Sequence, residues 1–135
     1  MTEQLARDAM VPEPLSLDAS ASAQEAAEAL ARPEVRAVFV CDDGRLTGVI
    51  TRKTLVTEVV ARGLDPKTTT VGSFAEPPNA TIESTAMLAD AFAFLEERDY
   101  ERVPVVEEGR LVGVLSRSAV QRRLAEDEPP VAETS

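Results

Sequence analysis

The residues best suited to binding chemistry form two hydroxyl–arginine pairs, Thr51-Arg52 and Ser116-Arg117, which lie 65 positions apart. Each pair follows a β-branched run that predicts a strand and opens a stretch that predicts a helix. A helix start carries free backbone N–H groups and the positive end of the helix dipole, so it favours anions. A cation in the first turn opposes that dipole. Arg52 and Arg117 therefore indicate either a bound anion or side chains that turn into solvent.

An internal repeat positions the two pairs. A shift of 65 residues places GRLTGVITR (44–52) on GRLVGVLSR (109–117), with six of the nine pairs identical. The same offset places Pro12 on Pro77 and continues without a gap. Chance rarely keeps one register over about fifty residues, so two copies of one structural unit are expected.

Each copy predicts the order strand, helix, strand, strand, helix. Acidic-Gly turns at 42–45 and 107–110 join the last two strands. The N-cap of the first helix is expected at Ser20 or Ser22 in one copy and at Ser84 or Thr85 in the other. Apolar residues at i, i+3, i+4 and i+7 predict the buried faces of these helices. They are Ala23, Ala26, Ala27 and Leu30 in one copy, and Leu88, Ala91, Phe92 and Leu95 in the other.

The fold class is therefore α/β (α+β), with tandem β-α-β-β-α repeats. Residues 1–65 are assigned to the first repeat with a lead-in helix, 66–126 to the second repeat with a linker at 63–79, and 127–135 to a disordered acidic tail. The last helix of the first repeat runs from Thr51 to about Arg62. Its expected apolar face is Leu55, Val56, Val59 and Val60.

Composition excludes several classes of protein. The 135 residues carry a net charge of −10, which repels nucleic-acid phosphates and anionic lipid surfaces. No apolar run approaches the ~18–20 residues of a membrane span. One cysteine and no histidine exclude an intrachain disulfide, a Cys/His zinc site and the usual catalytic triads and dyads. No nucleophile has a base beside it and no signal peptide opens the chain, so a non-enzymatic, cytoplasmic protein is expected.

The segments VPVV (103–106) and GRLVGVLS (109–116), with VFV (38–40) and GRLTGVIT (44–51), resemble the cystathionine-β-synthase (CBS) domain pair, or Bateman module. The resemblance covers residues 8–125 and implies two repeats related by pseudo-two-fold symmetry in a stand-alone regulatory module. It also implies a regulatory ligand, AMP, ADP, ATP or S-adenosylmethionine, in a cleft between the repeats. A homodimer that signals to a protein partner is the assembly that it implies.

The resemblance also implies which residues hold the ligand, with no metal and no catalytic residue among them. They are Arg36, Val38, Thr51, Arg52, Thr54, Arg102, Pro104, Ser116 and Arg117.

Two positions depart from the family pattern, which usually has an aspartate for the ribose hydroxyls. Thr54 and Ala119 stand there, and loss of a bidentate carboxylate contact weakens binding by around a hundredfold. Phe39 replaces the proline that the second copy keeps as Pro104. The first copy, with Thr51 and Thr54, is the favoured site. The alternative to a nucleotide sensor is a ligand-independent scaffold of the same fold, which the two missing aspartates favour.

Overall fold

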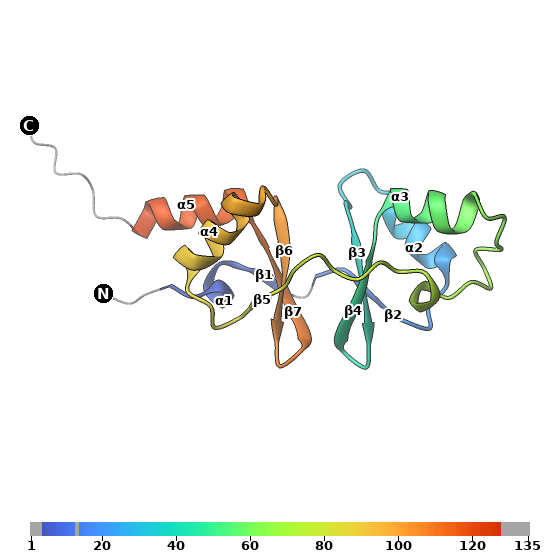
Figure 1. Cartoon of the computed structure of the whole chain (residues 1–135), viewed down its shortest axis with the longest axis horizontal. Coiled ribbons are helices and arrows are strands. Elements are labelled where there is room, and N and C mark those ends of the chain that lie inside the picture. Colours follow the sequence, from blue (N-terminus) through green and yellow to red (C-terminus); the bar gives the residue numbers. More distant parts are fainter. Residues whose placement is uncertain (1–3, 13, 128–135) are drawn as a thin grey trace, which may run out of the picture. The chain divides into compact units, whose positions relative to one another are not determined.

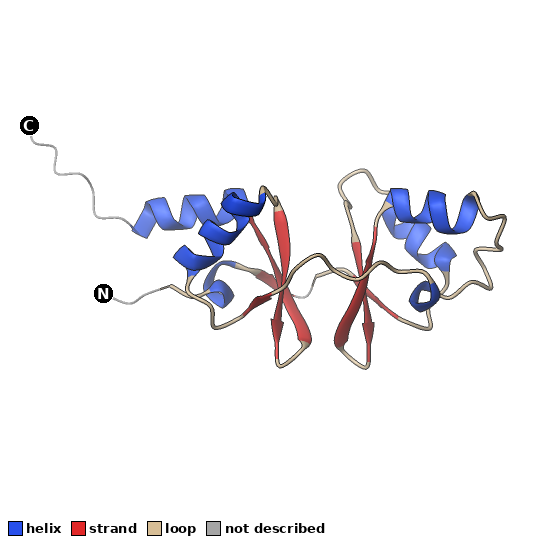
Figure 2. Ribbon diagram, viewed as in Figure 1, coloured by secondary structure: helices blue, strands red, loops and turns tan. Residues whose placement is uncertain are grey.

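The computed structural model describes residues 4–12 and 14–127, which divide into two compact units. The first-repeat unit comprises residues 14–79 and 109–111, and the second-repeat unit comprises the described residues of 4–12, 80–108 and 112–127. In each unit the helices lie on one side of the strands (Figure 2). The α+β class is confirmed. The acidic tail predicted for 127–135 lies outside the described residues, except that Asp127 ends the last helix.

The first-repeat unit is built on three neighbouring strands, with β2 parallel and β4 antiparallel to β3. Its helices α2 and α3 lie together on one side of these strands (Figure 1). The core contains Leu30, Val38, Val40, Ile50 and Val59. The elements are β2 (Ser16–Asp18), α2 (Ala23–Leu30), β3 (Val38–Asp42), β4 (Arg45–Ile50), α3 (Arg52–Leu55), the π-helical η1 (Val56–Val60) and the 3₁₀ turn η2 (Val71–Ser73).

The second-repeat unit repeats this order and adds the lead-in helix. Strand β5 is parallel to β6, while β7 neighbours β6 and pairs antiparallel with β1. Helices α4 and α5 pack against each other, and the core contains Leu88, Leu95, Val103, Leu115 and Val120. The elements are α1 (Ala6–Ala9), β1 (Val11–Pro12), β5 (Ile82–Glu83), α4 (Leu88–Arg98), β6 (Arg102–Glu107), β7 (Arg110–Ser116) and α5 (Arg117–Asp127).

The acidic-Gly turns form the two hairpins as predicted. In the first, Asp43 and Gly44 have φ values of 54° and 83°; in the second, Glu108 and Gly109 have 52° and 82°. Two consecutive residues with positive φ make the type I′ geometry, whose twist matches that of the flanking strands. The first hairpin ends with the pair of Val38 and Ile50 at its open end, and α3 begins two residues after Ile50.

The two first helices begin differently from each other. Ser22 caps α2 in a reciprocal box, because its hydroxyl accepts from Glu25 N at 3.2 Å while the Glu25 carboxylate accepts from Ser22 N at 2.9 Å. The expectation of Ser84 or Thr85 as the cap of α4 is wrong. Helix α4 begins after Met87, and the buried Ser84 hydroxyl donates to Glu107 Oε1 at 2.7 Å instead.

The segment that precedes one repeat in the chain supplies a carbonyl acceptor to the first helix of the other repeat. Leu88 N donates to the Gln4 carbonyl at 2.9 Å, and Ala23 N donates to the Thr69 carbonyl at 2.8 Å. The first N–H groups of a helix lack partners within it, so these carbonyls satisfy them. Ala6 is fully buried in the second-repeat core. Residues 4–12 thus pack in the second-repeat unit. The ranges 1–65 and 66–126 assigned from the sequence divide the chain by its order instead.

The last helix of the first repeat presents a narrower apolar face to the core than its sequence indicated. Val59 is buried, and Leu55 one turn earlier packs against the core. Val56 and Val60, each the next residue along the helix, are 56% and 70% exposed. The prediction that these two valines face the core is therefore wrong.

Candidate functional site

Two arginines flank the open end of the first hairpin. Val38 pairs with Ile50 there, and Arg36 lies two residues before Val38 while Arg52, two residues after Ile50, is the first residue of α3. Both side chains are exposed, and Arg52 Nη2 donates to the Arg32 carbonyl at 2.9 Å. In the internal repeat Arg36 and Arg52 correspond to Glu101 and Arg117, so the first repeat has two cations where the second has one carboxylate and one cation.

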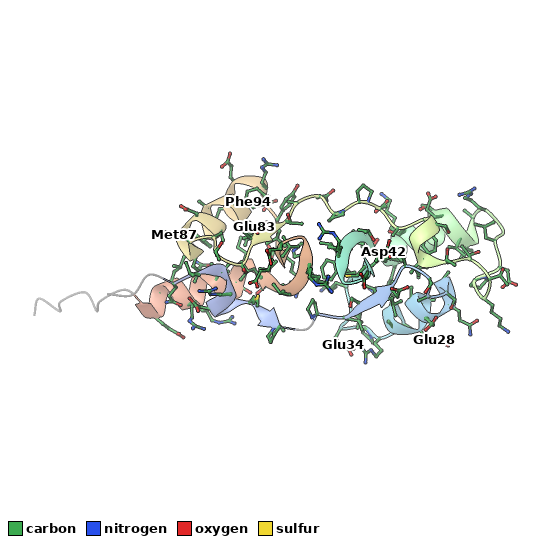
Figure 3. All side chains as sticks on the ribbon, turned by 90° about the horizontal axis from the view of Figure 1, so that it is seen from below. Glu28, Glu34, Asp42, Glu83, Met87 and Phe94 are labelled. Carbon is green, nitrogen blue, oxygen red and sulfur yellow. The ribbon has the colours of Figure 1, made fainter. Side chains whose placement is uncertain are left out.

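We refer to Arg32, Arg36, Arg52 and Lys53, all exposed, as the basic cluster. Glu34 contacts one of its members, since its carboxylate lies 3.7 Å from Arg32 Nε. Figure 3 labels this glutamate on the loop that follows α2. The chain as a whole carries −10, so the cluster is a local positive region on an acidic protein. Guanidinium groups bind phosphate through two parallel hydrogen bonds, which suits the cluster to a phosphorylated ligand.

The second repeat neutralises the equivalent arginine with its own carboxylates. Arg117 N donates to the Glu101 carbonyl at 2.8 Å, which places these residues opposite each other. The Arg117 guanidinium binds Asp99 Oδ1 at 3.1 Å and also the Glu101 carboxylate. The bond to Asp99, and then that to Glu101, raises the pKa of Arg117 above its usual value. Glu101 thus occupies the repeat position of Arg36. The second repeat has the ion pair of Arg117 and Glu101 where the first repeat has two arginines.

The hydroxyls expected to contact a ligand serve first to begin the helices. Thr54 Oγ1 accepts from Thr51 N at 3.1 Å, and Thr51 Oγ1 accepts from Thr54 N at 3.4 Å. Thr54 is only 1% exposed, so its hydroxyl faces its neighbours in the protein. In the second repeat, Ser116 Oγ accepts from Ala119 N at 3.2 Å, and Ala119 returns no side-chain bond. The reciprocal contact between two hydroxyl residues is therefore a feature of the helix start in the first repeat.

The remaining expected site residues are divided between surface and interior. Val38 is fully buried in the first-repeat core, and Pro104 is buried in β6. Arg102 is exposed where β6 begins. The structure thus brings Thr51 and Thr54 together and leaves Arg36 and Arg52 exposed at the open end of the first hairpin, but it places the Val38 side chain in the core.

Sequence reasoning missed Glu76, because residues 63–79 read as a linker. The exposed Glu76 carboxylate accepts from Thr54 Oγ1 at 3.4 Å through Oε2. The signal that identifies it is the repeat itself, since Glu76 precedes Pro77 as Val11 precedes Pro12. In the second-repeat unit, Val11 pairs with Val114, which is the counterpart of Val49.

Other reactive groups do not form a site in the described part of the chain. Cys41 is buried in β3, and burial raises the pKa of its thiol, as expected for a packing residue. Within residues 4–12 and 14–127, no three Cys, Asp or Glu side chains are grouped to hold a metal ion. Over the same residues, no helix is both long and apolar enough to cross a bilayer.

Comparison with known proteins identifies the family. The CBS domain model matches residues 6–61 and 71–126, so the chain belongs to the CBS domain family and carries two such domains in tandem. The chain is 34% identical to Hypoxic response protein 1 of Mycobacterium tuberculosis over 102 residues, which cover 75% of this chain and 71% of that protein.

Solved structures agree with this assignment. The crystal structure of Hypoxic Response Protein I with two coordinated zinc ions matches with a TM-score of 0.74 and 30% identity, covering 89% of this chain and 98% of that one. The structure of CBSX2 in complex with AMP matches with a TM-score of 0.71 and 26% identity, covering 90% and 96%. The fold is therefore that of CBS domain pairs.

Proposed function

We propose that the protein is a regulatory, non-catalytic CBS-pair module that binds an adenosine nucleotide and passes its bound state to a protein partner. The observation that carries the proposal is that Arg36 and Arg52 of the first repeat are both exposed cations, whereas their counterparts in the second repeat, Glu101 and Arg117, form an internal ion pair. Two guanidinium groups that lack such an internal carboxylate suit a phosphate. The AMP complex of CBSX2 supports adenosine nucleotides as the ligand class.

Thermal melts in the presence of nucleotides test this function. AMP, ADP, ATP, S-adenosylmethionine and NAD are compared at about 1 mM, with adenosine as the control that lacks a phosphate. A ligand with a Kd near 10 µM adds ~2.7 kcal/mol at that concentration and raises the Tm by several degrees. We expect the phosphorylated ligands to produce this shift and adenosine to produce less. Flat melts for every compound would instead support the ligand-independent scaffold.

We further propose that the module works as a homodimer in the cytoplasm, formed through α3 and η1. Val56 and Val60 are exposed on one face of this helix, where the second repeat has Gln121 and Ala125. Light scattering at tens of micromolar is expected to give the dimer mass, and Val60→Asp is expected to give the monomer. Ala125→Asp, at the equivalent position of the second repeat, is the matched control and should remain dimeric. A monomer before any substitution would contradict this assembly.

A further inference from the structure

The Glu76 carboxylate is fixed to the strand that leads into α3. Val49 N donates to the Glu76 carbonyl at 2.8 Å, and Glu76 N donates to the Val49 carbonyl at 3.0 Å. The side chain is attached separately, since Thr54 Oγ1 donates to Oε2 at 3.4 Å. An exposed glutamate normally keeps its rotamer freedom, and ordering it costs entropy. These three bonds hold an exposed negative charge in one place, beside the turn that contains Arg52.

The close approach of the segment with Ala75 and Glu76 to strand β4 depends on Gly48. A Cβ at Gly48 would lie 2.7 Å from the Ala75 Cβ and 3.2 Å from the Glu76 carbonyl oxygen. The second repeat keeps the same close approach, because a Cβ at Gly113 would lie 2.9 Å from the Val11 carbonyl oxygen. Both repeats therefore hold an extended segment against the equivalent strand.

The side chains carried by the two segments are chemically different. The first repeat pairs the Glu76 carboxylate with the Thr54 hydroxyl, whereas the second repeat has Val11 and Ala119 at the equivalent positions. Val11 is 63% exposed, so this position faces solvent without a polar group. A hydrogen-bond acceptor at this place is thus a property of the first repeat, which also carries the basic cluster.

A carboxylate held at the first turn of α3, the turn that Arg52 begins, restricts what binds there. Among the described residues, the Thr54 hydroxyl is the hydrogen-bond partner of the Glu76 side chain. A carboxylate has about four acceptor positions, so it can accept further hydrogen bonds. It repels a phosphate but accepts hydrogen bonds from neighbouring hydroxyls. We propose that Glu76 binds the sugar hydroxyls of a ligand whose phosphate lies on Arg36 and Arg52. This inference rests on the proposed function and assigns the sugar contact to a residue outside the predicted site.

Titration calorimetry with AMP and 2′-deoxy-AMP tests the role of Glu76. The unmodified protein is expected to bind AMP about tenfold more tightly than 2′-deoxy-AMP. A neutral or charge-assisted hydrogen bond to the 2′-hydroxyl contributes on that scale. Glu76→Gln should weaken AMP binding about tenfold and remove the preference for AMP. The sign is decisive, because removal of a negative charge that merely lay near the phosphate would strengthen the binding of both nucleotides.

Glu83→Gln is the matched control, since Glu83 is an exposed carboxylate on β5 of the second-repeat unit (Figure 3). It should leave both affinities unchanged, and melts without ligand should confirm that Glu76→Gln is folded. Equal or tighter AMP binding by Glu76→Gln would overturn the role of Glu76 while the proposed function stands. Failure of the unmodified protein to bind AMP would overturn this inference, and flat melts for every nucleotide would overturn the proposed function with it.

Discussion

Substitution of Arg52 by glutamate is expected to abolish the stabilisation of the protein by AMP. The variant leaves one carboxylate and one cation at these two positions, as Glu101 and Arg117 do in the second repeat. A cation of the proposed phosphate site, which also includes Arg36, is then lost, and a carboxylate that repels phosphate takes its place. Each charge-assisted hydrogen bond contributes about 1.5–3 kcal/mol, so the affinity for AMP should fall at least a hundredfold.

The measurement is calorimetry with AMP, together with melts in the presence and absence of the nucleotide. The melt without ligand should change little, since exposed ion pairs contribute about 0–1 kcal/mol. Arg122→Glu is the control, because Arg122 is exposed on α5 and lies outside the basic cluster. Retention of full AMP affinity by Arg52→Glu would contradict the assignment of the phosphate site.

Truncation of Leu95 to alanine is expected to give the largest loss of stability. Leu95 is fully buried on the core face of α4, where it contributes to the second-repeat core. Its removal loses the transfer free energy of the side chain and leaves a cavity, and substitutions of this kind cost about 2–5 kcal/mol. That is a large fraction of the ~5–15 kcal/mol by which domains of this size are stable.

Urea unfolding followed by circular dichroism gives the free energy of unfolding for the Leu95→Ala variant. The midpoint should shift to lower urea with little change in slope, because the surface exposed on unfolding is nearly the same. Glu96→Ala, at the exposed neighbouring position of α4, should stay within about 0.5 kcal/mol of the unmodified protein. A loss below 1 kcal/mol for Leu95→Ala would show that α4 does not pack as described.

The tandem organisation and most elements could be predicted from the sequence because local physics determines them. The i, i+3, i+4, i+7 apolar spacing identified α2 and α4, and the Asp43-Gly44 and Glu108-Gly109 turns identified both hairpins. These signals depend on residues a few positions apart. The pairing of Val38 with Ile50 also follows from the hairpin, once the turn that sets its register has been found.

Contacts between distant segments were decided only by the tertiary structure. Residues 4 and 88, 23 and 69, and 54 and 76 meet because segments outside the repeat motifs supply backbone acceptors or a side chain to the helix starts. The same packing decided that Met87 rather than Ser84 or Thr85 occupies the N-cap position of α4, and that Val56 and Val60 remain exposed. Sequence patterns show which groups need partners, whereas packing and hydrogen-bond geometry across many residues select those partners.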